Sequence, residues 1–181
     1  MKKLIMLTAV GLGAFMLNAA TVTWTVSGVK TVDDAAVNAS GYSAFLFYTA
    51  STVVGDSVVS YDDVIASITA GTFASDYSSK AIATGTTATY GNYTKTGLGS
   101  YGAGDSVSAF TVIFDAASIA DAENYAVMAD KTASFTSATG AKTLGFTNFS
   151  ATTTWQAVPE PTSGLLMLVG LAGLALRRRR A

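Results

Sequence analysis

Several stretches of the chain alternate between apolar and polar residues with the period of two that is typical of β-strands. Residues 21–27 alternate strictly between apolar side chains and hydroxyls, which predicts a strand with one buried face. Residues 43–49 carry apolar side chains on both faces, as strands in the middle of a sheet do. Residues 106–114 predict a second strong strand. The pattern therefore predicts a domain that is mainly β.

The rest of the chain alternates less clearly up to residue 146, and residues 147–155 alternate again. Further strands are predicted over residues 80–84, 86–95, 125–129 and 147–155. Residues 132–136 and 142–146 flank Gly140 and are typical of a β-hairpin, while the glycine-rich stretch 96–104 favours a flexible loop. The threonine-rich first and last strands resemble each other, and their pairing would bring the two ends of the domain together.

One helix interrupts the strands, over residues 60–70. Ser60 can cap its N-terminus, and Asp63 stands three residues later, as in a capping box. Apolar residues recur on one face, and Gly71 can end the helix. Together these elements predict a single antiparallel β-sandwich-like domain of about eight to ten short strands with one short helix.

The N-terminus has the features of a secretory signal peptide. Two lysines follow Met1, an apolar run covers residues 4–17, and small residues suited to cleavage come next. We expect a signal peptide over residues 1–20 that directs the chain to the Sec translocation machinery and is cleaved after Ala19 or Ala20.

The C-terminus carries a second signal-like segment, over residues 158–181. A proline motif at 159–161 comes first, and both prolines of the chain lie in it, which favours an extended and stiff backbone. An uncharged, mostly apolar run follows over residues 162–176. Its strictly apolar part covers about 18 Å as a helix, which is short for a bilayer core of about 30 Å. Arginines end the segment, and they are expected to stay on the cytoplasmic side of a membrane.

This order of parts resembles the PEP-CTERM sorting signal. The residues that carry the resemblance are Pro159, Glu160 and Pro161 of the motif and Arg177, Arg178, Arg179 and Arg180 of the terminal cluster. The resemblance implies recognition by an exosortase, a membrane-embedded cysteine transpeptidase, during a transient stay in the inner membrane. It also implies removal of the tail and transfer of the remaining passenger to the cell envelope, the outer surface or an extracellular polysaccharide matrix. Residues 21–157 would form that passenger, with 156–157 as a tether.

The composition excludes several kinds of chemistry. The chain contains neither histidine nor cysteine, so a Ser-His-Asp triad, a thiol nucleophile and a zinc–thiolate site are all excluded. Residues 21–157 contain five lysines, no arginine and eleven acidic residues, a formal charge of −6. Such an acidic domain lacks the cations that neutralise phosphates, so we expect no binding to nucleic acid.

The candidate residues for binding or catalysis are few. Adjacent acids at 33–34 and 62–63 do not supply the separated pair of carboxylates that a glycosidase needs. Oxygen ligands for calcium are plentiful, but no EF-hand loop occurs, and we expect neither a metal nor a cofactor. Three tyrosines near the glycine-rich stretch are candidates for stacking on a sugar, namely Tyr90, Tyr93 and Tyr101.

The sequence thus favours a non-enzymatic protein of the envelope or extracellular matrix. The alternatives are a surface carbohydrate-binding or adhesin module, which the tyrosines suggest, and a carboxylate-based hydrolase.

Overall fold

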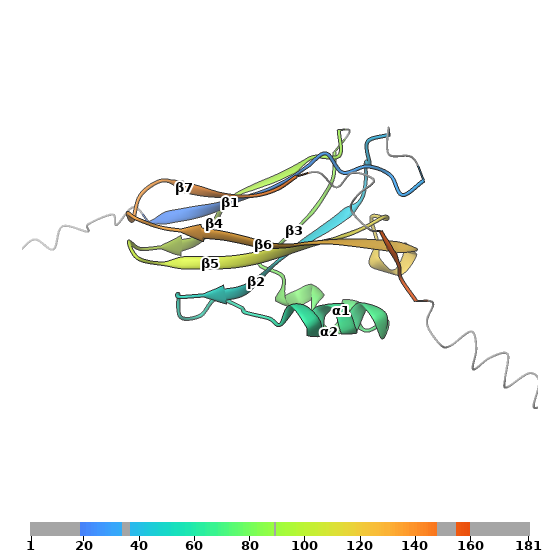
Figure 1. The fold of residues 1–181 in the computed structure, drawn as a ribbon, viewed down its shortest axis with the longest axis horizontal. Coiled ribbons are helices and arrows are strands. Elements are labelled where there is room, and N and C mark those ends of the chain that lie inside the picture. Colours follow the sequence, from blue (N-terminus) through green and yellow to red (C-terminus); the bar gives the residue numbers. More distant parts are fainter. Residues whose placement is uncertain (1–18, 34–36, 89, 148–154, 160–181) are drawn as a thin grey trace, which may run out of the picture.

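The computed structural model describes residues 19–33, 37–88, 90–147 and 155–159, and within them two β-sheets pack face to face (Figure 1). The smaller sheet contains, in order, β4 (Tyr93–Tyr101), β1 (Ala20–Ser27) and β7 (Ala141–Thr147). The larger sheet contains β3 (Ala83–Thr86), β2 (Ser43–Ser51), β5 (Ser106–Phe114), β6 (Asn124–Ser134) and β8 (Gln156–Ala157). The prediction of a mainly β sandwich is confirmed.

Helices cover the outer face of the larger sheet, away from β1, β4 and β7 (Figure 1). They are α1 (Tyr61–Thr69) and the single turn α2 (Phe73–Asp76). Two 3₁₀ turns complete the described elements, η1 (Ser78–Lys80) and η2 (Ile119–Asp121). The described part of the molecule therefore has three layers, with the larger sheet in the middle.

β1 forms as its alternation predicts. Val22, Trp24 and Val26 are buried between the sheets, and the residues between them are partly exposed. The Trp24 indole Nε1 donates a hydrogen bond of 3.1 Å to the Thr111 hydroxyl of the opposite sheet, so that neither buried polar group is left unpaired. β1 is thereby fixed at the centre of the smaller sheet and tied across the sandwich.

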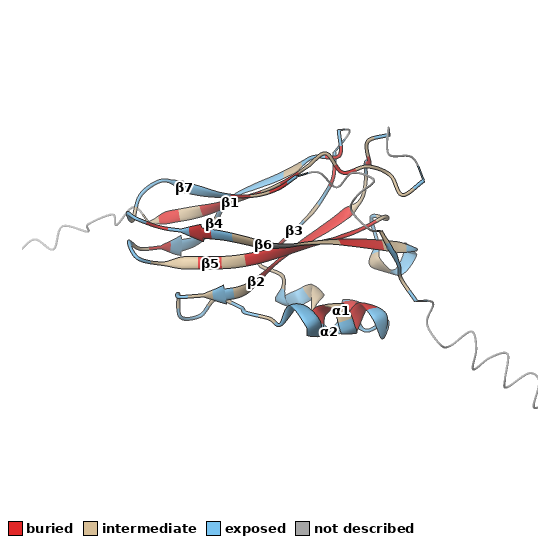
Figure 2. Ribbon diagram, in the orientation of Figure 1, coloured by how far each residue is buried: buried red, intermediate tan, exposed pale blue. Residues whose placement is uncertain are grey.

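β2 and β5 lie next to each other in the larger sheet and are buried on both faces (Figure 2), which was predicted for residues 43–49. Their inward side chains, such as Leu46 and Ile113, pack with β1 between the sheets. Their outward side chains form a second apolar cluster with the helices, and it contains Phe45, Phe47, Val64, Ile68, Phe73, Phe110, Val112, Phe114 and Tyr125. The alternation of β2 and β5 thus supplies two cores, one on each side of the larger sheet.

The glycine-rich stretch 96–104 was predicted to be a loop, and this prediction is wrong for most of it. Residues 96–101 belong to β4, which pairs with β1 in antiparallel register. The register shifts twice, between Ala20 and Val22 and again between Val22 and Trp24, so β4 contains two β-bulges. Gly97 and Gly99 lie at these bulges with φ of 72° and 69°, a conformation that favours glycine. The glycines therefore bend a strand instead of ending it.

The predicted hairpin around Gly140 is also wrong. Its first half is the end of β6 in the larger sheet, and its second half is β7, which runs parallel to β1 in the smaller sheet. The turn therefore carries the chain from one sheet to the other, and the smaller sheet is mixed. β6 itself is longer than expected because a bulge opposite residues 109–111 lets residues 125–134 continue as one strand. The weak strands predicted over 80–84 and 86–95 are replaced by η1, β3 and the start of β4.

The helix prediction is confirmed. The Ser60 hydroxyl accepts a hydrogen bond from the Asp63 amide, and Val64 and Ile68 are buried on the face that meets the sheet. Gly71 follows with a φ of 72°, which stops the helix.

The two ends of the described fold do not meet. Ala20 opens β1 at one end of the sandwich, and β8 lies at the other end (Figure 1). Most of the predicted strand over 147–155 lies outside the described residues, as do the apolar runs 4–17 and 162–176. Within the part of the chain that the structure describes, no helix is long and apolar enough to cross a membrane.

Candidate functional site

The folded domain continues directly into the proline motif. Gln156 and Ala157, which were predicted to be a tether, form β8 and pair with β6 in antiparallel register, Tyr125 opposite Gln156 and Asn124 opposite Ala157. The Val158 amide extends this ladder by donating a hydrogen bond of 2.8 Å to the Glu123 carbonyl. Pro159 comes next, so no free residue separates the ladder from the motif. Glu160, Pro161 and Arg177 to Arg180 lie outside the described residues.

A tyrosine of β6 adds a side-chain contact to this ladder. The Tyr125 hydroxyl donates a short hydrogen bond to the Gln156 amide oxygen. Burial raises the pKa of the Tyr125 hydroxyl above its usual value, and a hydrogen bond with Thr69 opposes this only in part. The hydroxyl therefore keeps its proton at neutral pH and remains a donor for β8.

Asp115 shapes the strand edge that β8 uses. It follows β5, and its Oδ1 accepts hydrogen bonds of 2.9 Å from the amides of Glu123 and Asn124. Its Oδ2 accepts a third, of 2.8 Å, from the Asn124 side chain. These bonds close the connection from β5 to β6, and they leave the Glu123 carbonyl directed at Val158.

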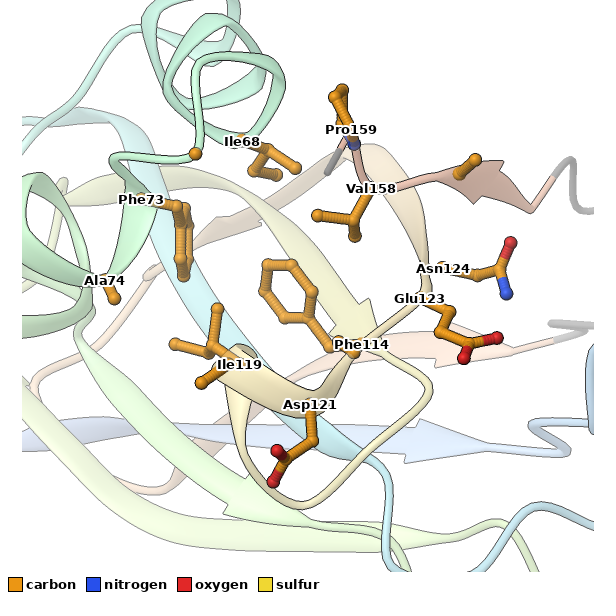
Figure 3. A pocket seen from close by; sticks show the side chains of 14 residues that line it. Ile68, Phe73, Ala74, Phe114, Ile119, Asp121, Glu123, Asn124, Val158 and Pro159 are labelled. Atoms are coloured by element: carbon orange, nitrogen blue, oxygen red, sulfur yellow. The ribbon is translucent and has the colours of Figure 1, made fainter. Parts of the chain in front are cut away.

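Val158 joins residues 156–158, the docked segment, to the second apolar cluster, which lies on the outer face of the larger sheet and is called the outer apolar cluster below. Its side chain is partly buried and packs against that cluster, and it lines a cavity of about 880 Å³ together with Ile68, Phe73, Phe114 and Ile119. Figure 3 shows Val158 and Ile119 on opposite sides of the Phe114 ring. The first residue before the motif is therefore held by apolar contacts as well as by backbone hydrogen bonds.

The polar groups near this cavity are acidic or neutral. The carboxylates of Asp121 and Glu123 point away from its apolar side chains (Figure 3). None of the described residues that line it is a serine, threonine, tyrosine, lysine or arginine. No three acidic side chains of the described residues lie close enough to hold a metal ion. The apolar lining is suited to holding an extended apolar peptide.

The three tyrosines proposed as ligand aromatics do not form a common surface. Tyr101 is only 1% exposed; it stacks on Phe135 and shares a hydrogen bond of 2.9 Å with Tyr48. Tyr93, at the other end of β4, packs edge-on against Trp24 and donates to the Thr84 carbonyl. Tyr90 is 71% exposed. Two of the three therefore pack within the sandwich, and Tyr90 is exposed apart from them.

The residues predicted to flank signal cleavage lie at the start of the fold. Ala19 precedes β1, and Ala20 is its first residue, 1% exposed and paired with Tyr101. Of the paired acids, Asp63 lies in the first turn of α1, and Asp34 lies outside the described residues.

Sequence reasoning found the motif but missed the residues that hold the chain beside it, namely Asp115, Glu123 and Tyr125. Only Asp115 gave a usable signal, because an aspartate directly after a strand often bonds to backbone amides of the following loop.

Comparison with known proteins agrees with the reading of the tail. A family model for the PEP-CTERM protein-sorting motif matches residues 157–180. No curated protein and no solved structure matches the chain. The motif implies export to the cell envelope or the extracellular side, with an exosortase as the processing partner. The C-terminal segment is thus a PEP-CTERM protein-sorting motif, and the passenger domain before it has no recognised family.

Proposed function

We propose that this protein is a non-enzymatic component of the bacterial cell envelope or extracellular matrix, and that an exosortase removes its tail and transfers the passenger to its destination. The observation that carries the proposal is the sorting motif at residues 157–180, directly behind a folded β-domain. An extracellular polysaccharide is the acceptor or surrounding matrix that this family of signals suggests. The apolar run 162–176 holds the chain in the inner membrane until it is cut.

A structural role for the passenger is supported by what its carboxylates do. Asp115 holds backbone amides, as described above. Asp56 accepts a hydrogen bond of 2.6 Å from the Ser51 hydroxyl, and Asp105 accepts one of 2.7 Å from the Gly102 amide. These acids stabilise turns, and the chain has no histidine or cysteine to act as a base or nucleophile beside them.

Export through the Sec machinery fits the start of the fold. Ala20 is buried as the first residue of β1, so cleavage after Ala19 leaves β1 complete, whereas cleavage after Ala20 removes one of its buried side chains. We therefore assign the signal cleavage to the bond after Ala19.

The test is the intact mass of the protein from its native host and from a host that lacks the exosortase. We expect a mature chain that begins at Ala20 and ends between residues 158 and 161 in the first host, and a chain that keeps Arg177 to Arg180 in the second. A full tail in both hosts would contradict removal of the tail. An unbiased hydrolase screen on the mature protein is expected to be negative, and reproducible activity would overturn the non-enzymatic role.

A further inference from the structure

The sorting motif begins where the fold ends, and this creates a conflict over one short segment. The backbone of Gln156 to Val158 is already bonded to β6, and Val158 packs on the outer apolar cluster. An enzyme that cuts a peptide holds it in extended form, and usually does so by bonding to the same backbone groups. The Val158 amide cannot donate to the Glu123 carbonyl and to an enzyme at the same time.

The docked segment is suited to reversible release. β8 has two residues, both exposed, and among the described strands it pairs only with β6. Its described attachments are the short ladder, the Tyr125–Gln156 hydrogen bond and the partly buried Val158 side chain. Short edge segments of this kind open locally at much lower cost than the whole domain unfolds.

We propose that β8 is a releasable strand that holds the cleavage region against the passenger, and that the exosortase acts on the released form. The passenger then sets the rate of its own sorting through the stability of the β6–β8 contact. This inference rests on the proposed removal of the tail.

A disulfide between the two strands tests the proposal directly. Asn124 and Ala157 are paired, and they alternate with the hydrogen-bonded pair of Glu123 and Val158, so they occupy the closer type of antiparallel pair that suits a disulfide. Because the chain contains no cysteine, Asn124→Cys/Ala157→Cys forms one defined bond. Ser108→Cys/Thr132→Cys is the matched control, since these hydroxyls lie 3.0 Å apart across β5 and β6.

Pulse–chase labelling of the full chain in its host measures the rate of tail removal. In the oxidised Asn124→Cys/Ala157→Cys chain we expect removal to slow by about tenfold or more. Dithiothreitol should restore it in the same chain, which excludes misfolding as the cause. The control disulfide should be processed like the wild type, and the single variants Asn124→Cys and Ala157→Cys should show no slowing that dithiothreitol reverses. Removal at the wild-type rate with the disulfide closed would overturn the proposal.

A milder variant tests the opposite direction. Tyr125→Phe keeps the buried ring and removes the hydroxyl that holds Gln156, so we expect tail removal to become about fivefold faster, the effect of one typical hydrogen bond. Tyr93→Phe removes a comparable bond to the Thr84 carbonyl far from β8 and should leave the rate unchanged. An unchanged or slower rate for Tyr125→Phe contradicts the proposal.

The failure of this inference is distinct from that of the proposed function. If the wild-type tail is removed and the disulfide has no effect, only the release of β8 is wrong. If the wild-type chain keeps its arginines, the proposed removal fails and the release of β8 fails with it.

Discussion

β1 and β8, the first and last strands of the described fold, differ in how firmly they are held. β1 has eight residues, pairs along both edges, and buries every second side chain. β8 has two exposed residues, and β6 is its one partner among the strands that the structure describes. The predicted signal peptide adjoins the strand that is held firmly, and the sorting motif adjoins the strand that is held weakly.

This difference indicates at which end the domain tolerates cleavage of the chain. At the N-terminal end, a cut displaced by one residue removes a buried alanine from the centre of a sheet. At the C-terminal end, the outer cluster retains Phe73, Phe114 and Tyr125 whether or not β8 is attached. We therefore expect the sandwich to stay folded when β8 is released for the proposed removal of the tail.

The largest expected effect on the free energy of unfolding comes from a substitution in β1. Trp24→Ala should lower the free energy of unfolding by about 3–5 kcal/mol, because it leaves a large cavity and removes the partner of the Thr111 hydroxyl. Urea denaturation measures this loss. Tyr90→Ala, at an exposed aromatic, is the control and should change stability by no more than about 0.5 kcal/mol. Similar losses for both variants would show that β1 is not the centre of the sandwich.

Hydrogen exchange compares the two strands without any substitution. The Val158 amide should exchange about a thousandfold faster than the slowest amides of β1, a difference of about 4 kcal/mol in opening free energy. Exchange followed by NMR resolves the individual amides. Equal protection of Val158 and β1 would remove the contrast on which the release of β8 depends.

Truncation measures what β8 contributes to the whole domain. A chain that ends at Trp155 should be less stable than one that ends at Pro159 by about 2 kcal/mol, the sum expected for a partly buried valine and a few hydrogen bonds. Thermal unfolding of the two chains, both starting at Ala20, gives the difference. If the shorter chain fails to fold, β8 is an integral strand and its ready release is wrong.

The end of the sandwich near Ala20 also holds two buried tyrosine hydroxyls, which predicts a dependence on alkaline pH. Burial raises the pKa of Tyr48 and of Tyr101 above the usual value near 10. The folded state therefore keeps protons that the unfolded state releases, so this stabilisation is complete below about pH 10 and is lost as the pH rises further. The ordinary tyrosine pKa is near 10, so urea titrations are made from about pH 9 to about pH 11. Over this range the free energy of unfolding should decline less for Tyr48→Phe than for the wild type. An equal decline would assign the effect to other groups.

The strands with strong apolar patterns were predictable, because burial selects the apolar positions. β1 alternates strictly, whereas β2 and β5 are mostly apolar along their whole length. The cap at Ser60 made α1 predictable as well. The smaller sheet was harder. In β4, Gly97 and Gly99 have the composition of a loop, and only the register with β1 shows that they form bulges.

The candidate site was predictable only in part, for a similar reason. The proline motif can be read locally, since prolines constrain their own backbone. Gln156 and Ala157 show no apolar alternation, and their partners Tyr125 and Asn124 lie some thirty residues earlier in the chain. Contacts of this kind depend on where the β5–β6 connection places β6 in space. The local sequence pattern of β8 gives no information about that position.

The position of β1 also determines when the domain can finish folding. A chain that emerges N-terminus first presents β1 early, but its partners β4 and β7 begin at Tyr93 and Ala141. Folds that depend on such distant pairings form slowly. β1 therefore cannot complete its pairing until almost the whole passenger has emerged. The sandwich closes only when the chain has emerged nearly as far as its sorting motif.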